Sequence, residues 1–459
     1  GQILINGDDP KQLEQTKNHR VVQFGQGKGS DFKIEYLPSD GNHLELKFRE
    51  FFFKSPLYGS YNFSNLAAAV SFGALFEVPL KDIQKAIAKY DSENNRSQKL
   101  SIQGTQIILD AYNANPSSMG VALRAFAKNQ TENNAVILDG CRVVKYDRLV
   151  VCPGIKLDWG RIDGLLETLG KNGVTSNYRY DLAPYTWQLV QGLKGGRALF
   201  TQPPMPIKCA GAPQKAMYLS ADHWLQQGRL KNIDIHFMNA GGVLFGVKDY
   251  VPALESYVQK YGASLDFFHN LVAVDGARKT ATFEVAKPDT EKTRVQVEFD
   301  MMHVCPPQVA PDFIRVSPLA DAAGWVDVDQ ASLRHKTYDN IWSLGDVMNA
   351  PNAKTAAAAR MQAPVVAENL CADIDGHSPA AQYNGYGSCP LTVERGKIVL
   401  AEFGYGGALL PSFPKWVIDG TKPSRAAWML KEQILPPVYW RAMLRGKEWL
   451  AKPQKVSAS

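Results

Sequence analysis

The first 138 residues alternate between short apolar runs and amphipathic segments. Apolar runs, and runs in which apolar and polar residues alternate, are typical of strands. They predict strands at 3–5, 21–24, 32–36, 44–48, 106–110 and 134–138. Helical periodicity predicts a helix over Lys81–Tyr90, and Ser60–Asn65 predicts a capped start for the alanine-rich helix that follows. This succession of strands and helices indicates an α/β fold.

The rest of the chain shows the same alternation. Arg148–Ile155 predicts a buried strand that closes in a Pro-Gly turn, and Ile341–Leu344 predicts a strand that ends in Gly-Asp. A strand over 197–201, a helix over 214–227 and a strand over 234–239 predict a Rossmann-like βαβ unit. The fold class predicted for the whole chain is therefore α/β, with Rossmann-like units in its C-terminal portion.

Composition places the chain among globular proteins of more than one domain. Of its 459 residues, 45% are hydrophobic and 21% are charged, and the formal net charge is +6. So small an excess of charge over this length does not indicate a nucleic-acid partner. We expect no secretory leader and no apolar run long enough to span a membrane.

The cysteines are too sparse for a disulfide framework, which indicates a reducing compartment. None lies in a CxxC pair or at zinc-ligand spacing to a histidine, so no metal site is predicted. The six are Cys141, Cys152, Cys209, Cys305, Cys371 and Cys389.

Several C-terminal positions carry residue types that suit a flavin. The turn at Pro153-Gly154 lets backbone amides approach a nucleotide closely, and Gly345-Asp346 at a strand end can hold a ribityl hydroxyl. A helix predicted to start at Lys354-Thr355 would favour the electron-rich edge of a reduced flavin, with Lys354 adding charge. The alternative for Lys354 is a solvated surface lysine. The loop 202–213 carries prolines and a cysteine where a nicotinamide site would carry GxGxxG, which argues against NAD(P)H as reductant.

Together, five segments resemble the sulfide:quinone oxidoreductase family, in the form shared with mitochondria, and the resemblance continues to the C-terminus. The segments are Cys152–Gly154, Lys208–Lys215, His303–Pro307, Ala320–Val326 and Lys354–Ala358. The resemblance implies a flavoprotein enzyme with FAD as cofactor, sulfide or a related thiol as reductant, and a quinone as electron acceptor.

The resemblance also implies a pair of redox cysteines that face the flavin. Cys209 matches the first, and Lys208 and the predicted helix beside it should lower its pKa and make it a nucleophile. Cys209 and Lys354 are therefore the predicted catalytic residues, and an inert buried cysteine is the alternative for Cys209. The second redox cysteine is expected directly after Gly345-Asp346, where Val347-Met348-Asn349 stands. Other cysteines that could replace it, with nothing in the sequence to favour one, are Cys152, Cys305 and Cys389.

One motif of the family is missing. Its N-terminal domain carries the GxGxxG that binds the adenosine diphosphate of FAD, and this chain has no such motif there. Because the pyrophosphate loses its site at a helix end, we expect FAD affinity to fall severely.

The N-terminal portion resembles the Mur ligase family, especially the ligase that adds D-alanyl-D-alanine to a UDP-muramoyl tripeptide. The motifs are Tyr61–Ala68, Asn95–Gln98 and Asp110–Pro116. The resemblance implies that Asn62 and Asn65 lie near an adenine, and that Arg96 and Asp110 reach the ribose and phosphates of ATP. The chain lacks the GxxxxGK[ST] loop that such a ligase needs, so ATP-dependent peptide ligation is the second hypothesis.

The last 50 residues combine tryptophans with basic residues. Four tryptophans, at 416, 428, 440 and 449, interleave with lysines and arginines, and Pro436-Pro437 predicts a break between two short helices. Basic, tryptophan-bearing amphipathic helices lie in membrane interfaces, and a core-packing helix pair is the alternative. We therefore expect a cytoplasmic protein that associates peripherally with the inner face of the membrane.

These observations predict four segments. Residues 1–95 would be the late part of a Mur ligase-like ATPase domain and 96–138 the start of its terminal domain. Residues 139–410 would be a flavoprotein portion and 411–459 the membrane-surface helices. The junction near residue 140 joins strand to strand without a Gly/Ser/Pro linker, so a third hypothesis is an inactive chimera or a non-catalytic membrane-surface protein.

Overall fold

The computed structural model divides the chain into two compact units, Gly1–Arg148 and Leu149–Ser459. Each unit is described by itself. The structure describes residues 3–17, 19–27, 29–38, 43–57, 62–90, 98–102, 105–109, 134–138, 142–447 and 451–456.

The first unit contains a five-stranded mixed sheet in the order β1-β2-β3-β4-β5, parallel from β1 to β3 and antiparallel from β3 to β5. Every second residue of β4 is buried in one core with residues of helices α2 and α3. This burial explains why apolar and polar residues alternate along the strand. The elements are β1 (Ile3–Asn6), α1 (Pro10–Gln15), β2 (Val21–Gly25), β3 (Phe32–Leu37), β4 (Leu44–Phe48), β5 (Phe51–Ser55), α2 (Phe63–Leu75) and α3 (Leu80–Lys89).

Two antiparallel strand pairs follow in the same unit. They are β6 (Gln98–Ile102) with β7 (Thr105–Leu109), and β8 (Asn134–Leu138) with β9 (Arg142–Tyr146). The strand predicted at 134–138 is thus observed as β8. The capped helix start differs from the prediction, because Asn62 precedes α2 without a side-chain capping hydrogen bond.

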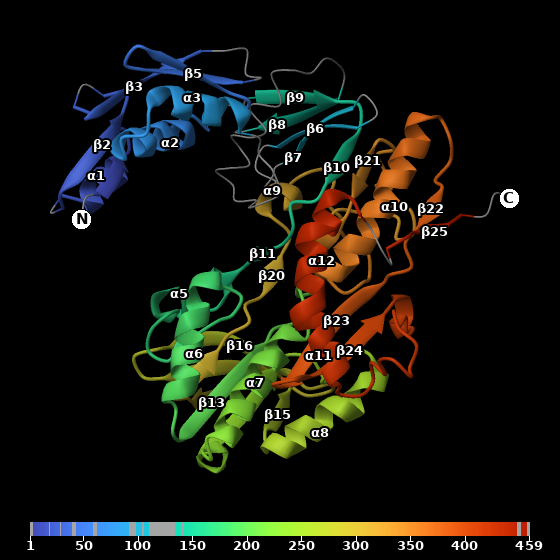
Figure 1. Ribbon diagram of the computed structural model, residues 1–459. Helices are drawn as coiled ribbons and strands as arrows, with labels where there is room; N and C mark the ends of the chain where they lie inside the picture. Colours follow the sequence, from blue (N-terminus) through green and yellow to red (C-terminus); the bar gives the residue numbers. More distant parts are fainter. Residues whose placement is uncertain are drawn as a thin grey trace. The chain divides into compact units, whose positions relative to one another are not determined.

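The second unit is built on a five-stranded, wholly parallel sheet in the order β12-β19-β13-β14-β15, of which β13 and β15 are labelled in Figure 1. The βαβ unit predicted from the sequence is formed by β13, α7 and β14. Helix α7 is mostly buried, and Trp224 at its end donates a hydrogen bond to the carbonyl of Val190 at 2.8 Å. The parallel elements are β12 (Val174–Thr175), β13 (Gly196–Gln202), α7 (Ala212–Gln226), β14 (Ile233–Asn239), α8 (Val251–Tyr261), β15 (Ser264–Phe267) and β19 (Met301–His303).

Further strands and helices surround this sheet. A three-stranded antiparallel sheet comprises β16 (His269–Asp275), β17 (Thr280–Val285) and β18 (Thr293–Glu298), and β23 (Gly387–Glu394) pairs with β24 (Lys397–Phe403). The other strands are β11 (Lys156–Leu157), β20 (Gln308–Val309), β22 (Ala381–Gln382) and β25 (Gln454–Lys455). The other helices are α5 (Leu165–Thr168), α6 (Ala183–Gly192), α9 (Asp312–Arg315) and α10 (Ala356–Ile374).

A short parallel pair, β10 (Leu149–Val151) with β21 (Ile341–Ser343), supports the two turns that the sequence singled out. The strand at Arg148–Ile155 is shorter than predicted and only partly buried, since Val150 is 38% exposed. The turns at Gly154 and Gly345 follow these two strands. The pair therefore brings together two segments that lie far apart in the sequence.

The C-terminal segment is one run of helix rather than the two broken helices that the sequence predicted. Helix α11 (Arg425–Met429) continues through a π-helical turn, η8 (Leu430–Ile434), into α12 (Leu435–Arg441). Pro436 and Pro437 follow directly on the π-helical turn η8, which already interrupts the α-helical i→i−4 hydrogen bonds. Their missing N–H groups therefore do not end the helix.

Candidate active site

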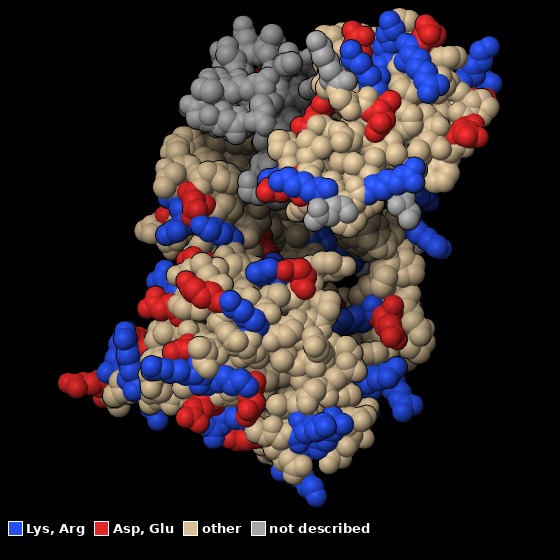
Figure 2. Space-filling model, turned by 90° about the vertical axis from the view of Figure 1, so that its left-hand side faces the viewer, with Lys and Arg blue, Asp and Glu red and all other residues tan. Residues whose placement is uncertain are grey.

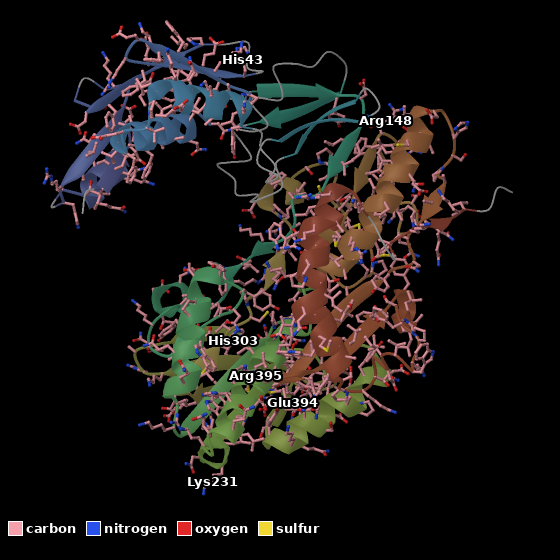
Figure 3. The ribbon with its side chains drawn as sticks, viewed as in Figure 1. His43, Arg148, Lys231, His303, Glu394 and Arg395 are labelled. Atoms are coloured by element: carbon pink, nitrogen blue, oxygen red, sulfur yellow. The ribbon has the colours of Figure 1, made fainter. Side chains whose placement is uncertain are left out.

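A cavity of 610 Å³ in the second unit collects most of the residues that the sequence predicted for the cofactor. Cys152 and Gly154 reach it from the end of β10, and Gly345 and Asp346 from the end of β21. His303, labelled in Figure 3, closes it at the end of β19. The other lining residues are Asn177, Tyr178, Lys208, Cys209, Ala212, Leu344, Lys354, Thr355, Ala356 and Ala359.

The cavity wall fits the ring and ribityl end of a flavin nucleotide. Gly154 and Gly345 have φ of 79° and 80°, a backbone region that favours glycine, and an added Cβ would project into open space at both. The first residues of the 19-residue helix α10 line the same cavity, and Thr355 caps that helix by accepting from the Ala358 amide. Positive φ, open space and a helix N-terminus together suit a close-lying, electron-rich ring. Pro153 precedes Gly154 in this turn but does not line the cavity.

Lys354 is buried at this wall, so the surface alternative is wrong. Its side chain is 6% exposed, and its Nζ donates to the carbonyls of Asp346 and Met348 at 2.7 and 2.8 Å. Burial lowers the pKa of Lys354 to about 8, against the opposing effect of nearby Asp346 and Asp321. Burial also raises the pKa of the Asp346 carboxyl.

Cys209 lies in the turn just before α7 and faces the cavity. Its φ is 51°, an uncommon value for a residue other than glycine. Its amide donates to the carbonyl of Lys354 at 2.8 Å, and its carbonyl accepts from the Ala212 amide at 2.7 Å. The two predicted catalytic residues are therefore joined directly through their backbones.

Cys389 is the cysteine that lies beside Cys209, whereas the position after Gly345-Asp346 carries no cysteine. Interaction with the Cys389 thiol lowers the pKa of Cys209, and the same interaction raises that of Cys389. Val347, where the second redox cysteine was expected, is fully buried in the hydrophobic interior. Cys389 lies on β23, far along the chain from Cys209.

Two lysines from different elements act on the cysteine pair. Lys215 on α7 places its Nζ 3.2 Å from the Cys209 sulfur, and its charge also lowers the pKa of Cys209. Lys431, on the π-helical turn η8, donates to the Thr392 hydroxyl at 3.0 Å. Burial and then the charge of Lys215 lower the pKa of Lys431 to about 8. Sequence reasoning missed Lys431, because a π-helical turn leaves no signal in the hydrophobic pattern.

The other candidate cysteines do not form such a pair. Cys305 is fully buried, and burial raises its pKa to about 12. Cys152 lines the cavity, and burial raises its pKa as well. High thiol pKa values disfavour the thiolate, so neither suits a nucleophile. Cys141 lies outside the described residues.

The residues predicted for ATP are only partly described. Asn62 and Asn65 lie together at the start of α2, where Asn65 Nδ2 donates to Asn62 Oδ1 at 3.1 Å. Arg96 and Asp110 lie outside the described residues. Within the described ranges there is no group of three or more His, Cys, Asp or Glu side chains that could hold a metal ion.

No family model matches the chain, but individual proteins do. The N-terminal resemblance has a partial counterpart in the UDP-N-acetylmuramoyl-tripeptide–D-alanyl-D-alanine ligase of Bacillus subtilis, which is 29% identical over 127 residues. That match spans 27% of this chain and 28% of the ligase. It shows similarity of a segment, and the ATP-site roles of Asn62, Asn65, Arg96 and Asp110 stay predictions.

The larger match covers most of the chain. The mitochondrial sulfide:quinone oxidoreductase of Mus musculus is 37% identical over 347 residues, which are 76% of this chain and 75% of the mouse protein. That of Dictyostelium discoideum is 42% identical over 323 residues, 70% of each chain. The solved sulfide:quinone oxidoreductase of Aquifex aeolicus shares the fold, with a TM-score of 0.52 at 14% identity over 97% of this chain and 92% of its own. The predicted resemblance is thereby confirmed, and the chain belongs to the sulfide:quinone oxidoreductase family.

Proposed function

We propose that this chain oxidises sulfide, or a related thiol, through the Cys209–Cys389 pair and passes the electrons through FAD to a quinone. One observation carries the proposal: the two thiols meet beside a cavity that the flavin-type turns line. The names of the relatives in mouse and Dictyostelium state the same activity for those proteins.

The chemistry divides unequally between the two sulfurs. Both cysteines are free thiols in the structure, which corresponds to the reduced pair. In the oxidised pair, hydrosulfide attacks the S–S bond, one sulfur leaves as a thiolate and the other keeps the added sulfur as a persulfide. A thiol of lower pKa is the better leaving group, so Cys209 leaves as the thiolate and Cys389 carries the persulfide. Lys215 and Lys431 stabilise the thiolate that forms.

FAD is the cofactor that the cavity and the family imply. When bound, it supplies a two-electron acceptor next to Cys209. Gly154, Gly345, Asp346 and the start of α10 would hold its ring and ribityl chain, with Lys354 beside the ring. The chain has no GxGxxG for the pyrophosphate. Binding therefore depends on the ring end of the site, and we expect FAD to be needed in excess during purification.

The C-terminal helices suit the surface of the membrane in which a quinone dissolves. Trp416 and Trp440 are 88% and 58% exposed, and Met429, Ile434 and Tyr439 are exposed as well. Apolar and aromatic side chains beside basic ones favour the headgroup region. No helix in the described part of the chain is long and apolar enough to cross a bilayer. We infer peripheral attachment, on the cytoplasmic face.

Sulfide-dependent reduction of a short-chain ubiquinone by the FAD-supplemented protein tests this proposal. Cys209→Ser and Cys389→Ser should each abolish the reaction, because either change removes the S–S bond that hydrosulfide attacks. Cys371→Ser, at an exposed cysteine on α10, is the matched control and should keep full activity. Activity that survives either of the first two substitutions would refute the assignment of the pair.

A further inference from the structure

Lys354 is held in place by a second layer of side chains that touch neither the cavity nor the cysteines. The segment Trp325–Val328 runs alongside Val347–Asn349 and is joined to it by backbone hydrogen bonds. The Val326 amide donates to the carbonyl of Val347, and the Asn349 amide to the carbonyl of Val326, both at 3.0 Å. These two segments contribute the groups that surround the Lys354 ammonium.

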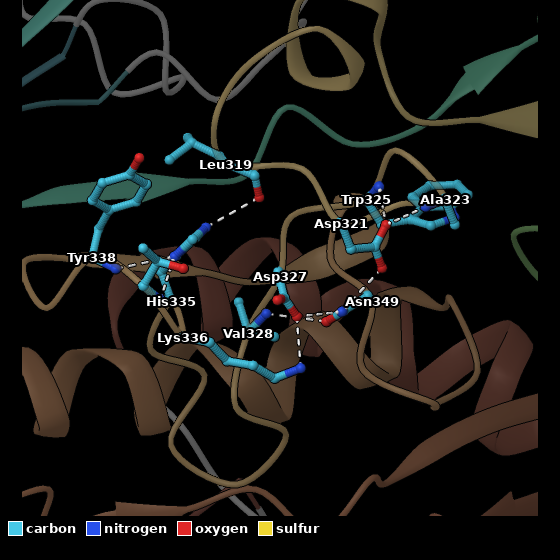
Figure 4. A network of polar contacts seen from close by, with 11 residues as sticks. Leu319, Asp321, Ala323, Trp325, Asp327, Val328, His335, Lys336, Tyr338 and Asn349 are labelled. Carbon is cyan, nitrogen blue, oxygen red and sulfur yellow. Dashed lines mark hydrogen bonds and ion pairs between the residues drawn. The ribbon is translucent and has the colours of Figure 1, made fainter.

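Asn349 fastens this turn with its side chain (Figure 4). Its Nδ2 donates to Asp321 Oδ2 at 3.1 Å and to Asp327 Oδ1 at 2.7 Å, and its Oδ1 accepts from the Val328 amide at 3.1 Å. These contacts use both the Nδ2 and the Oδ1 of the Asn349 amide, and none of the three partner residues lines the cavity. Asn349 follows Met348, whose carbonyl receives the Lys354 ammonium.

Trp325 covers the same ammonium from the other segment. Lys354 Nζ lies 4.2 Å from the centre of the Trp325 ring, within the range of a cation–π contact. Asp321 fixes the turn that carries Trp325, because its Oδ1 accepts from the amides of Ala323 and Trp325 at 2.9 and 3.0 Å. One carboxylate thus links the turn that places Trp325 to the amide that places Met348.

We propose that Asn349 is a positioning residue that holds the carbonyls of Asp346 and Met348, together with the Trp325 ring, around Lys354 so that its ammonium faces the flavin cavity. Two of the three N–H groups of the Lys354 ammonium donate to these carbonyls, and the Trp325 ring shields the ammonium from water. The remaining N–H is left for a group in the cavity. The carboxylates of Asp346 and Asp321 act on the Lys354 ammonium, and Lys208 and the Cys209 sulfur act in turn on Asp346. The use made of Lys354 rests on the proposed function, whereas its placement does not.

Competitive acetylation of the full chain, without FAD, tests the placement separately from the activity. Acetic anhydride is applied between pH 6 and 11, and the labelling of each lysine is followed by mass spectrometry of its peptide. In the parent, Lys354 should label slowly, with a midpoint near its pKa of about 8. In Asn349→Leu, a change of similar size that cannot hydrogen-bond, labelling should be at least tenfold faster at high pH and the midpoint should rise, because burial is the main cause of the low pKa.

Internal and matched controls separate placement from general unfolding. Lys431, a half-buried lysine near the cysteine pair, should label in Asn349→Leu as it does in the parent. Lys336→Gln breaks the outer contact to Asp327 at 2.7 Å while it leaves the Asn349 hydrogen bonds in place, and it should label as the parent does. If Asn349→Leu does not fold, Trp325→Phe takes its place in the test. This variant keeps a ring with a weaker cation–π contact over the ammonium, so Lys354 should be acetylated at a rate between that of the parent and that of an exposed lysine. Parent-like labelling of Lys354 in both variants, or simultaneous release of Lys354 and Lys431, would overturn the proposal.

Discussion

At the level of single residues, the pKa of Cys209 depends on groups from three other elements. The thiol of Cys389 on β23 lowers it first, then the charge of Lys215 on α7, and more weakly that of Lys431 near the C-terminus. Only Lys215 is close to Cys209 in the sequence. The family motif pointed to Cys209, but the nearness of Cys389 could be found only from the fold, because the sequence places no limit on which strand lies opposite a given loop.

Lys215→Gln should raise the pKa of Cys209, because the change removes the positive charge 3.2 Å from its sulfur. Each unit of pKa changes the thiolate fraction about tenfold at a pH below the pKa. The alkylation of Cys209 by iodoacetamide should therefore slow several-fold at mildly acidic pH and shift its midpoint upward, as followed by mass spectrometry. Lys194→Gln, at an exposed lysine of the same unit, should alkylate as the parent does. An unchanged midpoint in Lys215→Gln would show that the lysine does not tune the thiol.

At the level of elements, the pattern of the sequence predicted the interior strands best. The βαβ unit at 196–239 lies within two residues of its predicted bounds, because β13 and β14 are central strands whose apolar runs leave little choice. The C-terminal helices were less predictable. A π-helical turn and two prolines at the start of α12 follow local backbone geometry that periodicity does not encode. Lys431 is directed inward at that turn.

The parallel sheet carries an imidazole between two carboxylates on β14 and the edge strand β15. His236 on β14 lies 2.7 Å from Asp266 and 3.1 Å from Asp234, and these contacts, the Asp266 hydrogen bond first, raise its pKa. The folded state therefore holds the proton more tightly than the unfolded chain. The resulting stability is fully present below the unfolded pKa of about 6.5 and is lost as the pH rises through the folded pKa.

His236→Gln should accordingly lower the thermal unfolding midpoint more at pH 6 than at pH 9. The expected loss of unfolding free energy at pH 6 is of the order of 1 kcal/mol, since the group is partly exposed and solvent screens it. His377→Gln, in the loop after α10, serves as the control and should show the same small change at both values. An equal loss for His236→Gln at pH 6 and pH 9 would contradict the charged state assigned to this imidazole.

At the level of the whole molecule, sulfide:quinone oxidoreductases match most of the chain, whereas its N-terminal segment is similar to a Mur ligase. The missing GxGxxG was visible in the sequence. Figure 2 shows Lys and Arg interspersed with Asp and Glu over one face of the molecule, with no broad patch of one sign. That face gives no support for a nucleic-acid partner. The boundaries proposed at residues 95, 138 and 410 stay predictions.

Trp440→Ala should weaken binding to vesicles of phosphatidylcholine and phosphatidylglycerol. The side chain is exposed on α12, and losing about 1.4 kcal/mol of interfacial burial would weaken the Kd roughly tenfold. Trp187→Ala removes a tryptophan that is 49% exposed on α6 and should not change co-sedimentation. If both variants bind as the parent does, the C-terminal helices are not the membrane-contacting surface.

The central claim is that this chain transfers electrons from sulfide to a bound flavin through Cys209 and Cys389. The most direct measurement is an anaerobic titration of the FAD-supplemented protein with sulfide, followed by its visible spectrum. The account predicts that the protein takes up FAD, that sulfide bleaches the oxidised flavin band, and that Cys209→Ser and Cys389→Ser bind FAD without bleaching. A parent protein that stays colourless in excess FAD, or whose flavin band is unchanged by sulfide, would contradict it.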